Sequence, residues 1–205
     1  MVLNTQNTKS HKLVRKNVKY DRKKIKKTQQ HPSHALLDAK TFSRSKYLKY
    51  KNTCIQERME RGIGKSPQMN TLFRFWSLSL RATFNSVMYS DFKQYALEDS
   101  AAGYQYGLQC LFRFYSYGLE DRFRKDLFND FQYLVLMDMK QNNSLYGLEK
   151  LSAFLTFRKD KTPIELNETL DNLLTFQFTN VNSFKQVSAK EYFQNHSLST
   201  EITNI

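Results

Sequence analysis

The chain contains an internal repeat, which constrains its fold more than any other feature of the sequence. The run LFRFWS at residues 72–77 returns as LFRFYS at residues 111–116, at an offset of 39. The run YGL at residues 106–108 returns at residues 146–148, at an offset of 40. Duplication at such a period is typical of stacked supersecondary units that bury their apolar faces against their neighbours. The repeat therefore predicts a short solenoid.

Apolar residues within each unit follow the i, i+3, i+4 spacing of a helix, as in Leu72, Phe75, Trp76 and Leu80. The chain has only six glycines and three prolines in 205 residues, which disfavours a turn-rich all-β fold. We predict helices over residues 33–39, 43–61, 67–84, 86–102, 104–117, 120–141, 144–159 and 163–176. Short connections pair neighbouring helices antiparallel, so the expected fold is all-α, with HEAT-like helix-turn-helix repeats that form a short α-solenoid.

Two sequence patterns mark helix starts. Ser66 followed by Pro67 is a cap with proline at the first helical position. Thr162 with Glu165 three residues later is a capping-box pattern, which predicts that the last helix starts there.

The glycines fall into two groups. Gly62, Gly64, Gly103 and Gly118 are expected at breaks between helices. Gly107 and Gly147 occupy equivalent positions early in a helix, where a missing side chain would let neighbouring helices approach closely or would loosen the helix start.

The charge is unevenly distributed. The chain has 32 Lys and Arg against 19 Asp and Glu, a net charge of +13. Residues 1–30 carry ten of the basic residues and one acid, and few large apolar ones. We therefore predict a basic disordered arm at 1–30, a helical repeat domain at 31–176 and a weakly structured tail at 177–205. The arm could solubilise the chain, bind phosphates or serve as a nuclear address.

Residues 31–162 have a net charge of +7 of their own. A basic surface of this kind suits a polyanionic partner, either nucleic acid or an acidic membrane surface. No apolar run approaches the length of a membrane span and no signal peptide is evident, so we expect a soluble, cytoplasmic protein without a membrane partner.

The repeat offsets bring polar and aromatic side chains into columns on successive helices. Leu78, Tyr117 and Phe157 form one column, and Arg74 and Arg113 another. A third contains Arg81, Glu120 and Asp160. Two rings can hold a flat base between them, a carboxylate can accept hydrogen bonds from guanine, and arginines can bind phosphates. The surface would suit 7-methylguanosine and its phosphates; alternatively, Glu120 and Arg81 form an ordinary ion pair and the two rings are half-buried packing.

Three motifs resemble a known family. The runs MNTLFRFWS at residues 69–77, YGLQCLFRFYSYGLE at 106–120 and LYGLEK at 145–150 closely resemble the C-terminal DM-15 repeat region of La-related protein 1. HPSH at residues 31–34 and RGIG at 61–64 fit its opening. The resemblance covers residues 31–176.

The resemblance implies a HEAT-like domain that binds the 7-methylguanosine cap and the first nucleotides of mRNAs with a 5′-terminal oligopyrimidine tract, in translational regulation. It implies that Tyr117 and Phe157 enclose the cap and that Glu120 binds the guanine edge. Arg74 and Arg113 would lie along the phosphate bridge.

The resemblance also implies that Arg81 lies near the first transcribed nucleotide. Two other positions of this sequence depart from the family pattern. Phe157 stands where the family typically has Tyr, which keeps the stacking surface and loses the hydroxyl. Leu78 stands where an aromatic residue is expected near the first nucleotide. The first departure leaves cap binding as the expectation, whereas the second weakens that of selectivity for a leading cytosine.

The sequence does not predict an enzyme, a metal site or a cofactor. None of its four histidines lies in the repeat core, its two cysteines are too few for a thiolate metal site, and it has no phosphate-binding glycine loop or nucleophile elbow. Glu149 is expected to be a helix-surface charge rather than an acid catalyst.

Two other functions remain open besides binding of the capped mRNA 5′ end. One is a protein-binding α-solenoid scaffold, with translation-machinery proteins among its partners. The other is a cap-independent basic RNA binder, whose affinity would simply follow ionic strength.

Overall fold

The computed structural model describes residues 43–180, 182–186 and 189–195, and all regular secondary structure in this part is helical. The helices are α2 (Arg44–Arg61), α3 (Pro67–Ala82), α4 (Ser86–Ala101), α5 (Tyr106–Asp121), α6 (Lys125–Asn142), α7 (Tyr146–Phe157), α8 (Glu168–Asn172), the π-helical turn η2 (Leu173–Gln177), α9 (Ser183–Gln186) and α10 (Ala189–Asn195). This confirms the all-α prediction. The predicted arm at 1–30 and helix at 33–39 lie outside the described residues.

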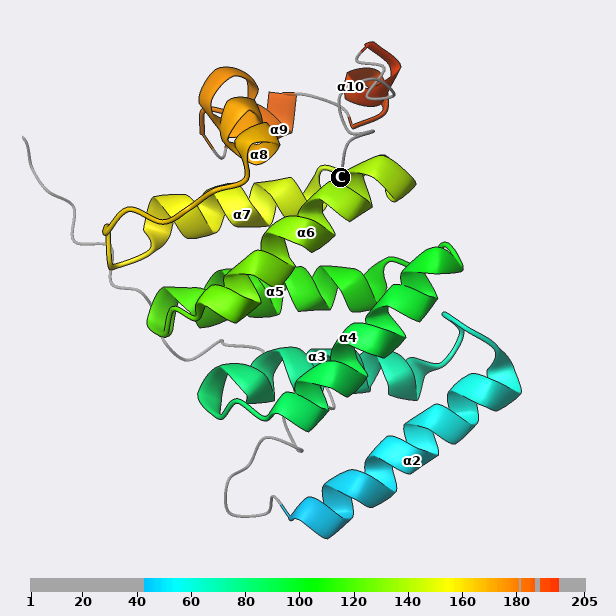
Figure 1. Ribbon diagram of the computed structural model, residues 1–205. Coiled ribbons are helices and arrows are strands. Elements are labelled where there is room, and N and C mark those ends of the chain that lie inside the picture. The colour runs from blue at the N-terminus through cyan, green and yellow to red at the C-terminus, as the bar shows by residue number, and fades with distance from the viewer. Residues whose placement is uncertain (1–42, 181, 187–188, 196–205) are drawn as a thin grey trace, which may run out of the picture. The chain divides into compact units, whose positions relative to one another are not determined.

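The helices form a two-layered stack. Helices α3, α5 and α7 lie side by side, and α4 and α6 cross them in the second layer (Figure 1). Helix α5 packs against α3, α4, α6 and α7, so it lies at the centre of the stack. This is the predicted HEAT-like solenoid.

The duplicated motif supplies the core of this stack. In each copy all residues except the arginine are buried: Leu72, Phe73, Phe75, Trp76 and Ser77 in α3, and Leu111, Phe112, Phe114, Tyr115 and Ser116 in α5. Burial of these large rings removes apolar surface from water, which is the main favourable contribution to folding. The repeat in the sequence is therefore a repeat of the interior.

Gly107 and Gly147 allow the close packing predicted for them. A Cβ atom at Gly107 would lie 2.9 Å from Phe73 Cζ, and one at Gly147 would lie 2.8 Å from Phe112 Cζ. Gly118, in contrast, lies inside α5 and not at a break, so its prediction is wrong. Helix α5 continues to Asp121 because the Arg122 N–H still bonds to the Gly118 carbonyl oxygen, at 3.1 Å.

A hydrogen bond and an ion pair, which together we call a polar unit, join α2 to α3 and α4 at the first repeat. Trp76 Nε1 on α3 donates to the Tyr47 hydroxyl on α2 at 2.9 Å. One turn further along α2, Lys51 pairs with Asp91 on α4 at 2.7 Å. The buried indole N–H thus has a partner, as a buried polar group requires.

The same unit occurs again one repeat later. The Tyr89 and Tyr115 hydroxyl oxygens lie 2.6 Å apart, and Tyr89 also donates to Asp130. One turn beyond Tyr89, Lys93 pairs with Asp130 at 2.8 Å. Helices α4, α5 and α6 are therefore joined in the way that joins α2, α3 and α4.

The third junction is different, and this changes the path of the chain. Phe128 and Phe154 pack with ring centroids 5.7 Å apart, and Gln132 stands at the position of the lysine. The side chain of Gln132 accepts from Asn167 N at 2.6 Å and donates to the Glu165 carbonyl oxygen at 3.4 Å. Residues 163–167 consequently stay outside any helix.

The predicted capping box at Thr162 is therefore wrong. Helix α8 begins at Glu168, and the Asn167 side chain caps it by accepting from Thr169 N at 3.0 Å. Within the predicted tail, the described residues form α9 and α10, and the Phe178 ring stacks on Phe184 with centroids 4.5 Å apart. The domain boundaries at 30 and 176 stay predictions.

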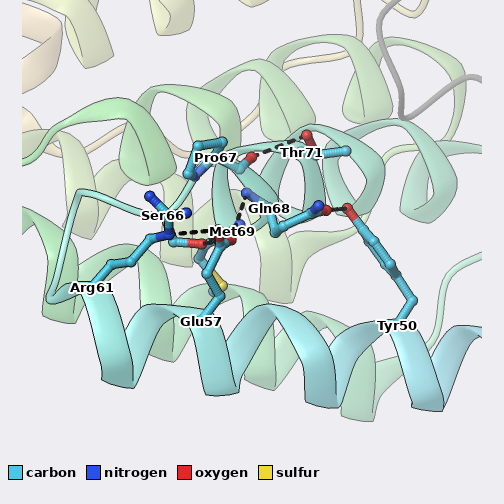
Figure 2. A network of polar contacts seen from close by, with 8 residues as sticks. All are labelled: Tyr50, Glu57, Arg61, Ser66, Pro67, Gln68, Met69 and Thr71. Atoms are coloured by element: carbon cyan, nitrogen blue, oxygen red, sulfur yellow. Dashed lines mark hydrogen bonds and ion pairs between the residues drawn. The ribbon is translucent and has the colours of Figure 1, made fainter.

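The cap predicted at Ser66 is confirmed at the start of α3 (Figure 2). Its Oγ accepts from Met69 N at 3.0 Å and donates to Glu57 Oε2 at 2.6 Å. Gln68 N also donates to Glu57, at 3.1 Å, and Arg61 pairs with the same carboxylate at 2.8 Å. The Ser66 hydroxyl lowers the pKa of Glu57, whose negative charge suits the N-terminal end of a helix.

Candidate nucleic-acid interface

The predicted site residues lie on α3, α5 and α7, from the middle of each of the first two helices to the end of the third, and their side chains are exposed or half-buried. We call this set the binding strip; it comprises Arg74, Leu78 and Arg81 on α3, Arg113, Tyr117 and Glu120 on α5, and Phe157 on α7. Tyr117 is 46% exposed and Phe157 is 64% exposed, whereas nearly all other aromatic residues of these three helices are buried or half-buried. Neither ring is sealed in the interior.

Tyr117 and Phe157 lie on neighbouring helices of the same layer, since α5 packs against α7. The aromatic contacts of the described residues include no contact between the Tyr117 and Phe157 rings. The arrangement of the two rings around a base stays a prediction.

Arg81 covers the ring of Tyr117 from α3. Its Cζ lies 5.1 Å from the ring centroid, and its Nε donates to the Ser77 carbonyl oxygen at 2.8 Å. The hydrogen bond to Ser77 and the cation–π contact with Tyr117 together hold the Arg81 guanidinium in place. Arg81 therefore covers one face of the Tyr117 ring.

Glu120 is half-buried beside this ring. Burial and the neighbouring Asp121 raise its pKa, and Lys159 and Arg81 act in the opposite direction. No ion pair joins Glu120 to Arg81 in the described part of the chain, so the alternative of an ordinary ion pair is not what the structure contains. The Glu120 carboxylate remains available to a ligand.

Two charged residues follow the end of α7; the column pattern did not predict Lys159, whereas it did predict Asp160. Lys159, just beyond α7, pairs with Asp121 at the end of α5 at 3.2 Å. Asp160, which was placed in the column of Glu120, instead accepts from Thr162 N at 2.9 Å within its own loop. The reason is that α7 ends at Phe157, so the helical offset no longer applies beyond it. The nearness of Lys159 to Phe157 in the sequence was the available signal.

The three arginines of the strip form a cationic group. Burial lowers the pKa of Arg81, and the positive charges of Arg113 and Arg74 lower it further. Arg113 Nη2 donates to Cys110 Sγ at 3.1 Å. Arg74 Nε is buried and has no hydrogen-bond partner, which is true of no other buried side-chain nitrogen or oxygen among the described residues.

Leu78 lies half-buried on α3, at the position equivalent to Tyr117 on α5. It supplies an apolar contact on the strip and no ring. The α3 side of the strip therefore offers charge, whereas the α5 and α7 sides offer stacking surfaces.

The described residues offer little for metal or thiol chemistry. They contain no group of three or more His, Cys, Asp or Glu side chains placed to hold a metal ion. Both cysteines are buried, and burial raises the pKa of the Cys54 thiol to about 11 and also raises that of Cys110. Thiols with raised pKa values are poor nucleophiles near neutral pH. None of the described helices is long and apolar enough to cross a bilayer.

Comparison with known families identifies the repeat domain. The family model described as the LARP1 HEAT repeat region matches residues 31–182, well over half of the 205-residue chain. The match includes every residue of the binding strip and the helices from α2 to η2. The chain therefore belongs to the LARP1 HEAT repeat family.

Proposed function

We propose that this family member binds the 5′ end of mRNA, with the 7-methylguanosine cap between Tyr117 and Phe157, and acts in cytoplasmic translational regulation. The observation that carries the proposal is the exposure of these two rings on adjacent helices, beside a half-buried carboxylate. Other rings of α3, α5 and α7 are largely used in the core. Rings left accessible at equivalent repeat positions are suited to a flat ligand.

The chemistry of the strip matches the parts of a cap. Stacking on an aromatic side chain contributes roughly 1–3 kcal/mol per base. The methylated base is positively charged, so the ring faces add a cation–π attraction. Glu120 can accept hydrogen bonds from the two N–H donors on the pairing edge of guanine. Arg74 and Arg113, which are half-buried on α3 and α5, would bind the phosphates.

Two residues limit what this member can recognise. Phe157 provides a stacking surface and no hydroxyl, which is sufficient for the cap. Leu78 provides no ring beside the first transcribed nucleotide, where Arg81 lies. We therefore expect that replacing a first cytosine by a purine changes the affinity little. The cap should contribute more to the affinity than the identity of the first nucleotide does.

The test compares a short capped RNA with its uncapped twin at moderate salt. The capped RNA should bind more tightly, and Tyr117→Ala or Glu120→Ala should remove the difference. Tyr133→Ala is a matched control for the ring, because Tyr133 is 59% exposed on α6. Glu149→Ala is a matched control for the charge, because Glu149 lies at the other end of α7 and pairs with its neighbour Lys150.

Two results would replace the proposal with another function. If the cap makes no difference and affinity follows ionic strength alone, the chain is a cap-independent RNA binder that uses its cationic group. If no RNA binds and a stable protein partner is found on the strip, the chain is a protein-binding scaffold.

A further inference from the structure

The loop between α7 and α8 contains one of two positions in the sequence at which a hydroxyl residue precedes a proline. The three prolines of the chain follow His31, Ser66 and Thr162. Proline-directed protein kinases require a proline directly after the Ser or Thr that they modify. The chain therefore offers such kinases two candidates, Ser66 and Thr162, and the surroundings of the two hydroxyls differ.

Ser66 is inaccessible because its hydroxyl is part of the cap of α3. The residue is only 1% exposed. Its Oγ accepts from Met69 N at 3.0 Å and donates to Glu57 Oε2 at 2.6 Å (Figure 2). A phosphate on this oxygen would place a second anion against the Glu57 carboxylate. Ser66 should therefore stay unmodified while the chain is folded.

Thr162 lies in an accessible segment. Both Thr162 and Pro163 are exposed, and residues 158–167 form no helix. The segment extends past the end of α7 before it returns to α8 (Figure 1). Proline disfavours helical backbone at the residue before it, so Thr162 is biased toward extended backbone. A kinase that binds its substrate as an extended peptide has no helix to unfold here.

Basic side chains lie close to Thr162. Arg158 Nη2 donates to the Thr162 carbonyl oxygen, and Lys159 and Lys161 are exposed in the same loop. The acid of the loop, Asp160, accepts from Thr162 N at 2.9 Å, and this N–H and the Thr162 hydroxyl lower the pKa of Asp160. A phosphate in place of the hydroxyl proton would break the hydroxyl contact with Asp160. It would gain charge-assisted hydrogen bonds from Arg158 instead.

We propose that Thr162 is a phosphorylation site for a proline-directed protein kinase and that its phosphate weakens RNA binding. The kinase brings ATP and Mg²⁺. The Thr162 Oγ1 atom forms a bond to the γ-phosphorus of ATP, and the bond from this phosphorus to the β,γ-bridging oxygen breaks. ADP leaves, and the hydroxyl proton passes to the catalytic aspartate of the kinase.

The phosphate would act on the binding strip through its charge. Phe157, one wall of the proposed cap site, directly precedes Arg158. Lys159 pairs with Asp121, the neighbour of Glu120, at 3.2 Å. A phosphate of about −1.5 to −2 charge would compete for these cations and repel the phosphates of RNA. This effect rests on the proposed function, whereas the modification itself does not.

The first experiment treats the folded chain with ATP and either a cyclin-dependent kinase or a mitogen-activated protein kinase. Peptide mass spectrometry then locates the phosphate, which should be on Thr162 and not on Ser66. Pro163→Ala keeps the hydroxyl but should abolish its modification, as Thr162→Ala does. Thr156→Ala is the matched control, because Thr156 is exposed and precedes no proline. No phosphate on Thr162 with either kinase, or equal modification in Pro163→Ala, would overturn the site.

The second experiment compares the phosphorylated and unphosphorylated chains in binding of the capped RNA and its uncapped twin. Phosphorylation should weaken binding by about threefold or more at low ionic strength, and by less as salt screens the charge. Thr162→Ala treated with the same kinase should bind as the untreated chain does. Unchanged affinity after complete phosphorylation would overturn the effect on RNA binding. If the unmodified chain binds no RNA, the proposed function fails, and the mass spectra still decide whether Thr162 is a phosphorylation site.

Discussion

Helices α3 and α5 are two copies of one sequence with different outer surfaces. Both carry the run Leu-Phe-Arg-Phe, an aromatic residue and Ser, and every member of the run except the arginine is buried in both. The copies diverge directly after this run. Leu78 in α3 corresponds to Tyr117 in α5, and Arg81 corresponds to Glu120.

The difference shows which positions hold the stack together and which are free to change. Neighbouring repeats must interlock, so each inward residue is constrained by the helices on both sides. The outward residues have no such constraint, and there one copy carries a cation and an aliphatic side chain while the other carries a ring and an acid. The two copies thus supply complementary parts of one surface.

The largest expected effect tests this comparison by removing one buried ring and one exposed ring and comparing the loss of stability. Phe112→Ala removes a fully buried ring of the duplicated motif and should lower the free energy of unfolding by about 3–5 kcal/mol. Phe157→Ala removes an exposed ring and should change it by less than about 0.5 kcal/mol. Urea denaturation measures both values, and capped-RNA titration should show a loss for Phe157→Ala.

The idea of a buried frame with a free outer surface would fail if Phe157→Ala destabilised the domain as much as Phe112→Ala does. It would also fail if Phe157→Ala left cap binding intact. Phe73→Ala is the matched control in the other copy, because Phe73 is equally buried and corresponds to Phe112.

The buried frame was predictable from the sequence, because duplication and helical spacing both report on inward-facing residues. The Ser66 cap and the close approach at Gly107 and Gly147 followed from the same local rules. Tyr117 and Phe157 are exposed on adjacent helices, and their place in one column around a base stays a prediction.

The errors lie where tertiary contacts override a local pattern. Thr162 has the spacing of a capping box, but Gln132 on α6 holds the following residues and the helix starts after Asn167. Asp160 left its column because α7 ends at Phe157. No local signal at either position reports on the neighbour or the helix end that decides the outcome.

The glycines offer a smaller test of inner against outer positions. Gly107→Ala would place a Cβ atom 2.9 Å from Phe73 Cζ and 3.0 Å from Ala96 Cα, and overpacking of this kind should cost about 1–3 kcal/mol. Gly118→Ala meets only ordinary contact and should stabilise the domain by roughly 0.5–1 kcal/mol through helix propensity. Thermal unfolding should show melting temperatures that move in opposite directions; two shifts of the same sign would show that Gly118 is also required by packing.

The smallest expected effect concerns pH and distinguishes the acid of α5 from the cation of α3. Burial and Asp121 raise the pKa of Glu120 above its ordinary value of 4.5, so the folded chain takes up this proton at a higher pH than the unfolded chain does. Two consequences have opposite signs. As the pH falls through the raised pKa, Glu120 loses the charge that accepts hydrogen bonds from the cap, and the ratio of capped to uncapped affinity should fall toward that of Glu120→Ala. Over the same pH range the free energy of unfolding should rise as the pH falls, because Glu120 binds its proton more readily in the folded state than in the unfolded state.

Arg81 keeps its charge throughout this range, so the affinity of uncapped RNA should change less than that of capped RNA. Titrations from neutral pH downward, with Glu120→Gln as the non-titrating control, measure the ratio. A ratio that stays constant until an ordinary glutamate would titrate would show that the half-buried position of Glu120 does not govern cap recognition. The ring of Tyr117, and not the acid of Glu120, would then be the difference between α5 and α3 that matters for cap recognition.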